Sequence, residues 1–508
     1  MEPALRRGAS GYEMVVYRRA KLRHNRPSGK GCNSMPRCKL HRLLAGALVG
    51  GALMSVAVAG AAAAQTPPQQ QAFRDIYREL VEIDTTDSNG DTLKAAEAMA
   101  ARLKAAGFPA ADIRVISTGP RKGNLVARLR GTGARKPMLL LAHIDVVPAG
   151  DGWQHDPFKL TEADGEFHGR GVIDDKAMAA IFLANLIEYY RDGFKPDRDI
   201  IVALTTDEEL AHSPHNGVRW ILENERALID AEFALNEGGG GALRNGRPFR
   251  LAVQLAEKVY QTYVLEVTDA GGHSAAPRRD NPIYRLSAAL TKLAQFDFPP
   301  RLNAVTRANF ERLAETEAPP MAAAIKALLA GTNDPVALAP LSANPTTNAQ
   351  MRTTCVATLL DAGTVENALP QTARATVNCR ILPDEPVEET ATILARVIAD
   401  DKVAISPKGR PMAAPPSPPH PEVMQAVSRL AGEMWPDVPV QATMSAGYTD
   451  NRWLRAAGIP AYGVSGLFSD QGRNGVHSVN ERVAVKDVYA SKQFLYDLVK
   501  QLAAGAQP

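Results

Sequence analysis

The stretch Met138–Asp145, MLLLAHID, decides the fold class, because a fully apolar segment runs directly into two polar side chains. Three further short apolar segments follow along the chain: Ile200–Leu204, Phe233–Leu235 and Ala461–Val464. Their apolar residues are continuous rather than alternating, which is typical of strands buried on both faces. Helical stretches at 177–190 and 217–222 lie among them. The pattern predicts an α/β fold with a mixed, mostly parallel sheet covered by helices on both faces.

Polar side chains that can bind metal follow these apolar segments. His143 comes after the first strand, Glu208 and Glu209 after the second, and Glu237 after the third. The carboxyl ends of parallel strands meet at one edge of a sheet, so we expect these groups to lie close together. The candidate ligands are His143, Asp174, Glu209, Glu237 and His477. Two imidazoles and three carboxylates are enough to hold two divalent ions, which predicts a hydrolase that activates water between two metals.

Nine motifs carry a resemblance to a known family. In chain order they are LLLAHIDVVP, GRGVIDDK, TTDEEL, LNEGGG, GGHSAAP, NALP, NCRILP, GYTDNRW and VHSVNE. Together they resemble the co-catalytic zinc exopeptidases related to aminoacylase, carnosinase and glutamate carboxypeptidase, which form metallopeptidase family twenty. The motifs extend from His143 to Glu481, and no single one would identify the family.

The resemblance implies how two zinc ions would be held. Asp174 would bridge both ions, and the peptide bond between Asp174 and Asp175 would be cis. His143 and Glu237 would complete one site. Glu209 would complete the other together with His477. Ligands of this mixture also accept cobalt or manganese, with availability deciding.

The resemblance also implies catalytic roles. Asp145 would orient His143 through the second ring nitrogen, which fixes the tautomer of that ligand. Glu208 would be the general base that takes a proton from the metal-activated water and passes it to the leaving amine. His273 would reach the active site of the partner subunit and stabilise the oxyanion, so that catalysis requires a homodimer.

Five further positions match family residues on the substrate side: Asn367, Arg380, Gly447, Thr449 and Asp450. The Arg380 guanidinium suits a bidentate grip on a free carboxylate. One departure from the family pattern follows Glu209, where the sequence contains His212 and His215 instead of an early glycine. We interpret it as a loop variation, with pocket shaping or adventitious metal binding as alternatives. This departure affects what the resemblance implies about substrate preference and leaves the predicted metal site unchanged.

The domain organisation follows from a change of pattern inside the chain. Residues 260–268 and 373–381 alternate as half-buried strands do, and a helical stretch follows each. We therefore expect a catalytic domain in two parts, 72–256 and 409–508, with a lid or dimerisation domain of α+β type inserted at 257–408. The proline-rich stretch Pro411–Pro421 would be the return hinge.

The net charge of +3 hides an uneven distribution. Residues 1–64 hold eleven Lys or Arg and two acids, a charge of +9, so the remaining chain carries −6, which does not favour nucleic-acid binding. Residues 35–64 are typical of an export signal with cleavage after Ala64, and they predict a periplasmic or secreted protein. An uncleaved membrane anchor is the alternative. Residues 1–34 leave open whether translation starts at Met1 or Met35.

Two cysteines would remain after export, Cys355 and Cys379. They lie at equal distances from a turn near Asn367, so a simple hairpin would place them opposite each other. An oxidising compartment would then permit a disulfide. Two buried free thiols are the alternative, because one β-bulge would turn one cysteine to the other face of the sheet.

The sequence therefore predicts a di-zinc hydrolase that cleaves an amide or peptide bond next to a free carboxylate, as a carboxypeptidase or dipeptidase does. An N-acyl-amino-acid deacylase is the first alternative, since it shares every catalytic part. A non-catalytic peptide-binding protein on the same fold is the second. It would be expected to have lost a ligand or the base, and Glu208 and all five ligands are present.

Overall fold

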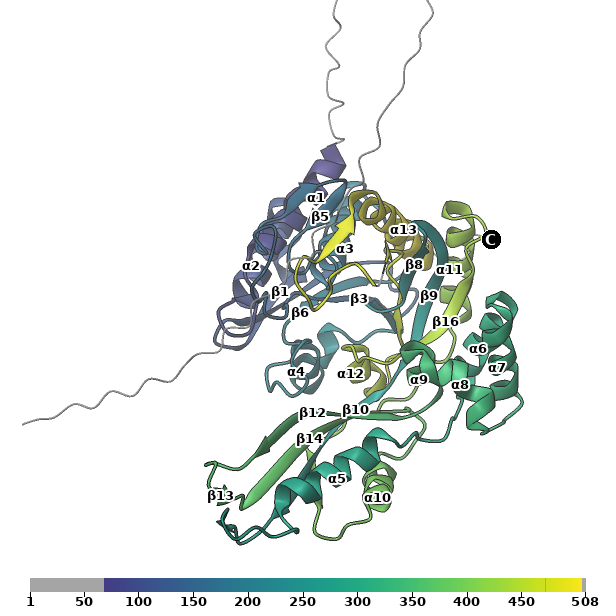
Figure 1. Cartoon of the computed structure of the whole chain (residues 1–508). Helices are drawn as coiled ribbons and strands as arrows, with labels where there is room; N and C mark the ends of the chain where they lie inside the picture. The colour runs from purple at the N-terminus through teal and green to yellow at the C-terminus, as the bar shows by residue number, and fades with distance from the viewer. Residues whose placement is uncertain (1–67, 471, 505–508) are drawn as a thin grey trace, which may run out of the picture. The chain divides into compact units, whose positions relative to one another are not determined.

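The computed structural model describes residues 68–470 and 472–504, so the predicted export signal at 35–64 lies outside the described residues. A ten-stranded mixed sheet lies at the centre of the larger part of the described chain (Figure 1). The strands in spatial order are β1 (Ile113–Gly119), β2 (Lys122–Leu129), β6 (Ile200–Thr205), β3 (Met138–His143), β7 (Phe233–Asn236), β17 (Ala461–Gly463), β9 (Arg247–Glu257), β8 (Gly240–Arg244) and β18 (Phe468–Ser469), with β16 (Val440–Ser445) paired to β9. Strands β6, β3, β7 and β17 run parallel. The predicted α/β class is confirmed.

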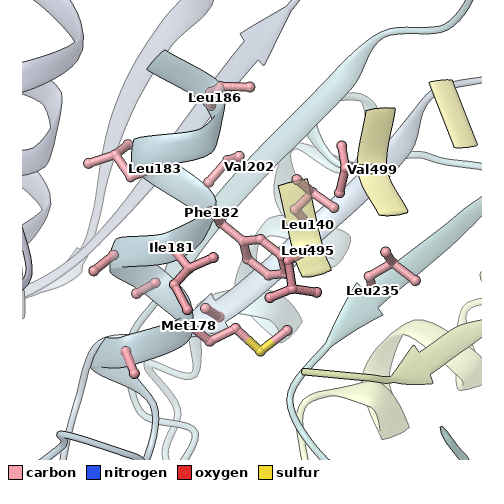
Figure 2. Close-up of a cluster of buried hydrophobic side chains, with 14 of the residues drawn as sticks. Leu140, Met178, Ile181, Phe182, Leu183, Leu186, Val202, Leu235, Leu495 and Val499 are labelled. Atoms are coloured by element: carbon pink, nitrogen blue, oxygen red, sulfur yellow. The ribbon is translucent and has the colours of Figure 1, made fainter. Parts of the chain in front are cut away.

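The central strands are buried on both faces, which explains their continuous apolar sequence. Leu140 and Val202 contribute to a core beneath α3 (Lys176–Arg191) and α13 (Val485–Ala503), as Figure 2 shows. Their neighbours Leu139 and Ile201 belong to a second core with α4 (Gly217–Asn224) and α12 (Asn451–Ala456). Successive side chains of a strand point to opposite faces, so each strand supplies both cores.

The remaining elements of the larger part flank this sheet. They are α1 (Pro68–Glu82), α2 (Thr92–Ala105), α11 (Pro421–Met434) and a small sheet of β4 (Thr161–Ala163), β5 (Glu166–His168) and β19 (Arg482–Ala484). Among residues 68–470 and 472–504, no helix combines the length and the apolar character needed to cross a bilayer.

A second, antiparallel sheet is formed by residues between Val259 and Lys408. Its order is β12 (Thr354–Ala362), β14 (Thr372–Ile381), β10 (Val259–Thr268) and β15 (Ala404–Lys408). Helices α5 (Pro282–Ala294) and α10 (Val387–Ile398) share one hydrophobic core with it. Strand β14 alternates between buried and more exposed residues, as the sequence predicts for a sheet with one open face.

Two smaller groups complete the fold. Strands β11 (Gly272–His273) and β13 (Ala368–Leu369) form a two-stranded sheet. Residues 304–351 form α6 (Ala304–Thr316), α7 (Pro319–Leu329), α8 (Pro335–Ala343) and α9 (Pro345–Met351). These four helices enclose a core of their own around Phe310 and Ile325.

Cys355 and Cys379 form a disulfide between neighbouring strands. They stand opposite each other in the register of β12 and β14, with an S–S distance of 2.02 Å. A bulge does interrupt β12, but it falls between Ala357 and Leu359. The bulge lies between the cysteine pair and the turn, and on its far side the register still places Cys355 opposite Cys379. The bridged alternative is the one observed.

Replacing both cysteines by alanine should lower the free energy of unfolding by about 3 kcal/mol, because the 24-residue separation then closes no loop in the unfolded chain. Denaturant unfolding of residues 65–508 with and without the double substitution measures this difference. Thiol labelling of residues 65–508 with both cysteines present, denatured without reduction, should find no free thiol. Two labelled thiols per chain would contradict the bridge.

Candidate functional site

The first group of candidate ligands meets at the end of β3. The Nε2 atom of His143 lies 3.0 Å from Asp174 Oδ1 and 3.8 Å from Glu237 Oε1. Asp174 lies two residues before the start of α3, and Glu237 comes immediately after β7. β3 and β7 are parallel neighbours, so their carboxyl ends bring His143 and Glu237 to one place.

The second group meets on the other oxygen of the same aspartate. His477 Nε2 lies 3.1 Å from Asp174 Oδ2 and 3.0 Å from Glu209 Oε2. Asp174 therefore has one carboxylate oxygen facing each histidine. Ligand atoms of His143, Asp174 and Glu209 fall within 4.8 Å of one another. The structure thus brings all five candidate ligands together around Asp174.

The backbone at Asp174 is held by a buried residue for which sequence reasoning gave no role. Glu481, with no exposed surface, accepts hydrogen bonds from the backbone N–H groups of Gly171 (3.0 Å), Ile173 (2.8 Å) and Asp174 (3.2 Å), and it pairs with Arg170 at 2.7 Å. The expected cis peptide bond is present between Asp174 and Asp175. An acid closing the VHSVNE motif was the available sequence signal.

Asp145 lies beside His143 but also has a second contact. The Nδ1 atom of His143 is 3.0 Å from the Asp145 backbone oxygen and 3.6 Å from its carboxylate. That carboxylate accepts hydrogen bonds from the backbone N–H groups of Glu208 (3.2 Å) and Glu209 (3.1 Å). Asp145 therefore connects the His143 loop to the loop that carries both glutamates.

Asp207 fixes the start of the same loop. Sequence reasoning placed it in the TTDEEL motif but gave it no structural role. Its backbone has a φ of 62°, and its buried carboxylate pairs with Lys122 at 2.8 Å and accepts from Ser213 at 2.5 Å. A left-handed conformation is unusual for a residue with a side chain. It turns the chain sharply after β6, so that Glu208 and Glu209 face the cluster.

The Glu208 carboxylate is buried and has an oxygen that can accept a proton or bind a cation. It is 5% exposed, and its Oε1 atom has no hydrogen-bond partner among the described residues. Burial raises the pKa of Glu208 well above its usual value, with a further increase from Asp450 and Glu209. Burial likewise raises the pKa of Glu237. Carboxylates crowded in this way are stabilised by cations, so the residues present fit a metal centre.

The carboxylates of the cluster raise the pKa values of both of its histidines. Burial alone would lower the pKa of His143, but the Glu237 carboxylate and a hydrogen bond to Asp174 raise it well above the usual value. Hydrogen bonds to Asp174 and Glu209 raise the pKa of His477 to about 10. The same hydrogen bonds outweigh burial at Asp174 and lower its pKa.

Metal affinity should therefore rise with pH, because an imidazole binds a metal only after it loses its proton. Since both histidine pKa values are raised, the protons are still bound at neutral pH and must be released on binding. Each released proton should weaken the apparent zinc affinity about tenfold for every unit by which the pH falls. Competition with a chromophoric chelator between pH 6 and 8 measures this. An affinity independent of pH would contradict the assignment of the ligands.

His273 and Asn367 lie in the small two-stranded sheet. His273 is exposed on β11, and its Nδ1 atom accepts a hydrogen bond from Ala275 N at 3.0 Å. The exposed Asn367 precedes β13, and its backbone oxygen accepts from Ser274 N. The structure brings these two residues together, but neither belongs to the groups of metal-ligating atoms within one chain.

The other substrate-side candidates differ in whether their polar groups already have partners within the described residues. Arg380, on β14, lies over the ring of Tyr260, 4.6 Å from its centroid, and Arg380 Nη1 has no hydrogen-bond partner among the described residues. Asp450 is buried, accepts from Asn216 Nδ2 at 2.8 Å, and affects the pKa of Glu208. Thr449 instead donates its hydroxyl to Glu257, which leaves that hydroxyl committed within the fold. Gly447 is exposed on the same loop.

Known proteins share both the sequence pattern and the fold. The family model "Peptidase family M20/M25/M40" matches residues 139–501. N-fatty-acyl-amino acid synthase/hydrolase PM20D1 of Mus musculus is 29% identical over 73% of this chain and 75% of its own length. Probable carboxypeptidase S-like 2 of Dictyostelium discoideum is 31% identical over 72% of this chain and 71% of its own. Among solved structures, the M20 family metallo-carboxypeptidase Sso-CP2 from Sulfolobus solfataricus has a TM-score of 0.65 at 16% identity, covering 86% of this chain and 99% of that one.

Proposed function

This chain belongs to the M20/M25/M40 peptidase family of metal-dependent hydrolases, and from that premise we propose that it cleaves an amide or peptide bond next to a free carboxylate with two zinc ions. The observation that carries the proposal is the convergence of two histidines and three carboxylates around Asp174. Each oxygen of Asp174 faces a different histidine, which is the arrangement that a bridging ligand requires. Cobalt or manganese would suit the same ligands.

The metal ions would be held by two sets of residues that share Asp174. His143 and Glu237 would complete one set, and Glu209 and His477 the other. When bound, the ions would polarise the substrate carbonyl and lower the pKa of a water held between them.

Glu208 would move the proton in this reaction. Its carboxylate is buried and its Oε1 atom is free to accept, and burial raises its affinity for a proton. A base with a raised pKa can take a proton from water and return it to the leaving amine, which a normal surface carboxylate does less well at neutral pH. Asp145 would keep Glu208 in position through its hydrogen bond to the Glu208 backbone.

Arg380 would bind the free carboxylate of the substrate. Its guanidinium is partly buried, and among the residues that the structure describes only its Nε has a hydrogen-bond acceptor, Asn378 Oδ1 at 3.2 Å. The remaining donors are therefore available for a bidentate contact.

A carboxypeptidase or dipeptidase and an N-acyl-amino-acid hydrolase would both fit this site, and the names of the relatives include both activities. Turnover of dipeptides and of N-acyl amino acids by zinc-loaded residues 65–508 tests the proposal. Hydrolysis within either class supports it, and the faster class identifies the activity. No hydrolysis in either class by metal-loaded protein would contradict it.

We include a homodimer in the proposal, because one edge of the second sheet has an apolar surface. Edge strand β12 exposes Val356 (62%), Leu359 (65%) and Leu360 (66%), and Tyr284 on α5 is also exposed (63%). An exposed apolar edge strand favours pairing with another chain. Such a dimer would let His273 serve the partner's site, where it would stabilise the oxyanion.

Mixing two inactive variants should restore activity if His273 acts across the dimer. Glu208→Ala and His273→Ala subunits, exchanged in equal amounts, should form heterodimers with one intact site each. The mixture should regain about a quarter of the wild-type activity per subunit, since half of the dimers carry one working site of two. Activity assays after subunit exchange measure this. If His273 acts within its own chain, mixing restores nothing.

Export to the periplasm or the medium completes the proposal. The disulfide between Cys355 and Cys379 supports it, because such bonds persist mainly in oxidising compartments. N-terminal sequencing of the protein produced in cells should find a mature chain beginning near Gln65.

A further inference from the structure

A cavity of about 460 Å³ is lined by Glu257 at the end of β9 in the large sheet and by Val259 and Tyr260 at the start of β10 in the second sheet. Its lining includes His212, Tyr260, Tyr448, Arg452 and Trp453. The lining residues Ala211 and His212 follow Glu208 and Glu209 on the same loop, and burial, with a smaller contribution from the Glu208 carboxylate, raises the pKa of Tyr448 to about 12. Tyr448 therefore stays neutral and keeps a hydroxyl that can donate.

Arg452 is the unexplained residue of this cavity. It is 5% exposed, and among the described residues no carboxylate lies within ion-pair distance of it. Its Nε atom has no hydrogen-bond partner in the part of the chain that the structure describes, and its guanidinium lies over the Tyr448 ring, 3.8 Å from the centroid. A buried charge without a partner is strongly disfavoured unless a ligand supplies one.

A second guanidinium, with no ion-pair partner among the described residues, faces the same tyrosine. Arg380 lies 5.4 Å from the Tyr448 centroid and 4.6 Å from that of Tyr260. Two like charges against one ring repel each other, and two anionic groups would relieve both. The aromatic faces are already covered by these guanidinium groups, which disfavours an aromatic substrate side chain there.

The acids of the cavity do not balance these charges. Glu223 is held by Arg219 at 2.9 Å, and Glu257 by Arg455 at 3.0 Å. His212 adds no positive charge, because burial, Arg452 and Lys408 lower its pKa and keep the imidazole neutral. Each lining acid thus has a cation within ion-pair distance. Within the described chain, Arg452 has no acid at that distance and acts on Glu257, Glu208 and Asp450 only through space, lowering their pKa values.

We propose that Arg452 determines substrate specificity by binding a second carboxylate, so that the enzyme prefers amides whose leaving amino acid is glutamate or aspartate. This rests on the proposed function, in which Arg380 binds the α-carboxylate of that amino acid. The side-chain carboxylate then lies on Arg452, with Tyr448 between the two cations. Charged hydrogen bonds discriminate an acid from its amide by about 10- to 100-fold.

The test compares glutamate and glutamine derivatives that carry the same acyl or aminoacyl group. Wild-type enzyme should have a kcat/KM at least about tenfold higher for the glutamate derivative. Arg452→Met should remove most of that ratio, and Arg452→Lys should retain part of it. Arg429→Met, which removes a surface arginine paired with Glu433, should leave the ratio unchanged.

Two measurements separate this role from a structural one. Because Arg452 has no acid partner, Arg452→Met should keep the melting temperature within about 2 °C of the wild type, whereas a structural arginine would lower it further. If Arg452 acts only through Glu208, the substitution would shift the pH profile equally for both substrates and leave the ratio unchanged, which would overturn the proposal.

Calorimetry on zinc-loaded protein tests the same point without turnover. Free glutamate should bind more tightly than glutamine, and Arg452→Met should abolish the difference. Equal binding of the two amino acids to wild-type protein would overturn the specificity role even if the enzyme is active. Absence of hydrolysis with preferential glutamate binding would contradict the proposed function and leave the role of Arg452 in place.

Discussion

Glu208→Ala should bind two metal ions and yet lose nearly all turnover. The carboxylate of Glu208 lies beside the ligand cluster, but Asp174 rather than Glu208 contacts both histidines. Removal of a general base lowers kcat by about 10²- to 10⁴-fold. Metal content by emission spectroscopy and kcat on the preferred substrate are the two quantities to measure.

The isosteric Glu208→Gln separates proton transfer from packing. It keeps the shape of the side chain and should be as inactive as the alanine variant. Glu97→Ala, at an exposed position of α2, should behave as wild type. A Glu208 variant with wild-type kcat would show that another group moves the proton.

Asp174→Ala should have the largest effect of any single substitution, because it removes a ligand from both proposed sites. Metal content should fall below two ions per chain, and kcat/KM should fall by about 10⁴-fold or more, since the source of the activated water is lost. Asp174→Asn should also fail, because an amide offers a weaker ligand and no charge. Metal analysis and steady-state kinetics on each variant give the result.

The matched control for Asp174 is Asp230→Ala, which removes an exposed aspartate from the larger part of the chain. It should retain both ions and full activity. If Asp174→Ala retained two tightly bound ions, Asp174 would not be the shared ligand and the division of ligands between two sites would be wrong.

The sheet was predictable because burial on both faces leaves a simple mark in the sequence. Met138–Ala142 and Ile200–Leu204 are apolar at every position, since each strand contributes to two cores. Strand β1 leaves no such mark, because it is an edge strand with several exposed residues. The four helices between Ala304 and Met351 were not resolved by the sequence, since short helices with a separate core lack a long apolar period.

The candidate ligands were predictable because metal chemistry restricts the residue types and strand ends restrict their positions. The supporting residues were not. Asp207 acts through a left-handed turn of its own backbone. Glu481 binds the backbone of Asp174, which lies 307 residues away in the chain. Arg452 looks in the sequence like a surface charge on a short helix, and only the tertiary structure reveals its burial without a partner.

The central claim is that one chain holds a pair of metal ions around Asp174. A crystal of zinc-soaked residues 65–508, recorded at the zinc absorption edge, tests it most directly. We predict two anomalous peaks per chain, one beside His143 and Glu237 and one beside Glu209 and His477, with an oxygen of Asp174 on each. A map without a peak at these side chains, or with a single ion that leaves one of the histidines unbound, would contradict the account.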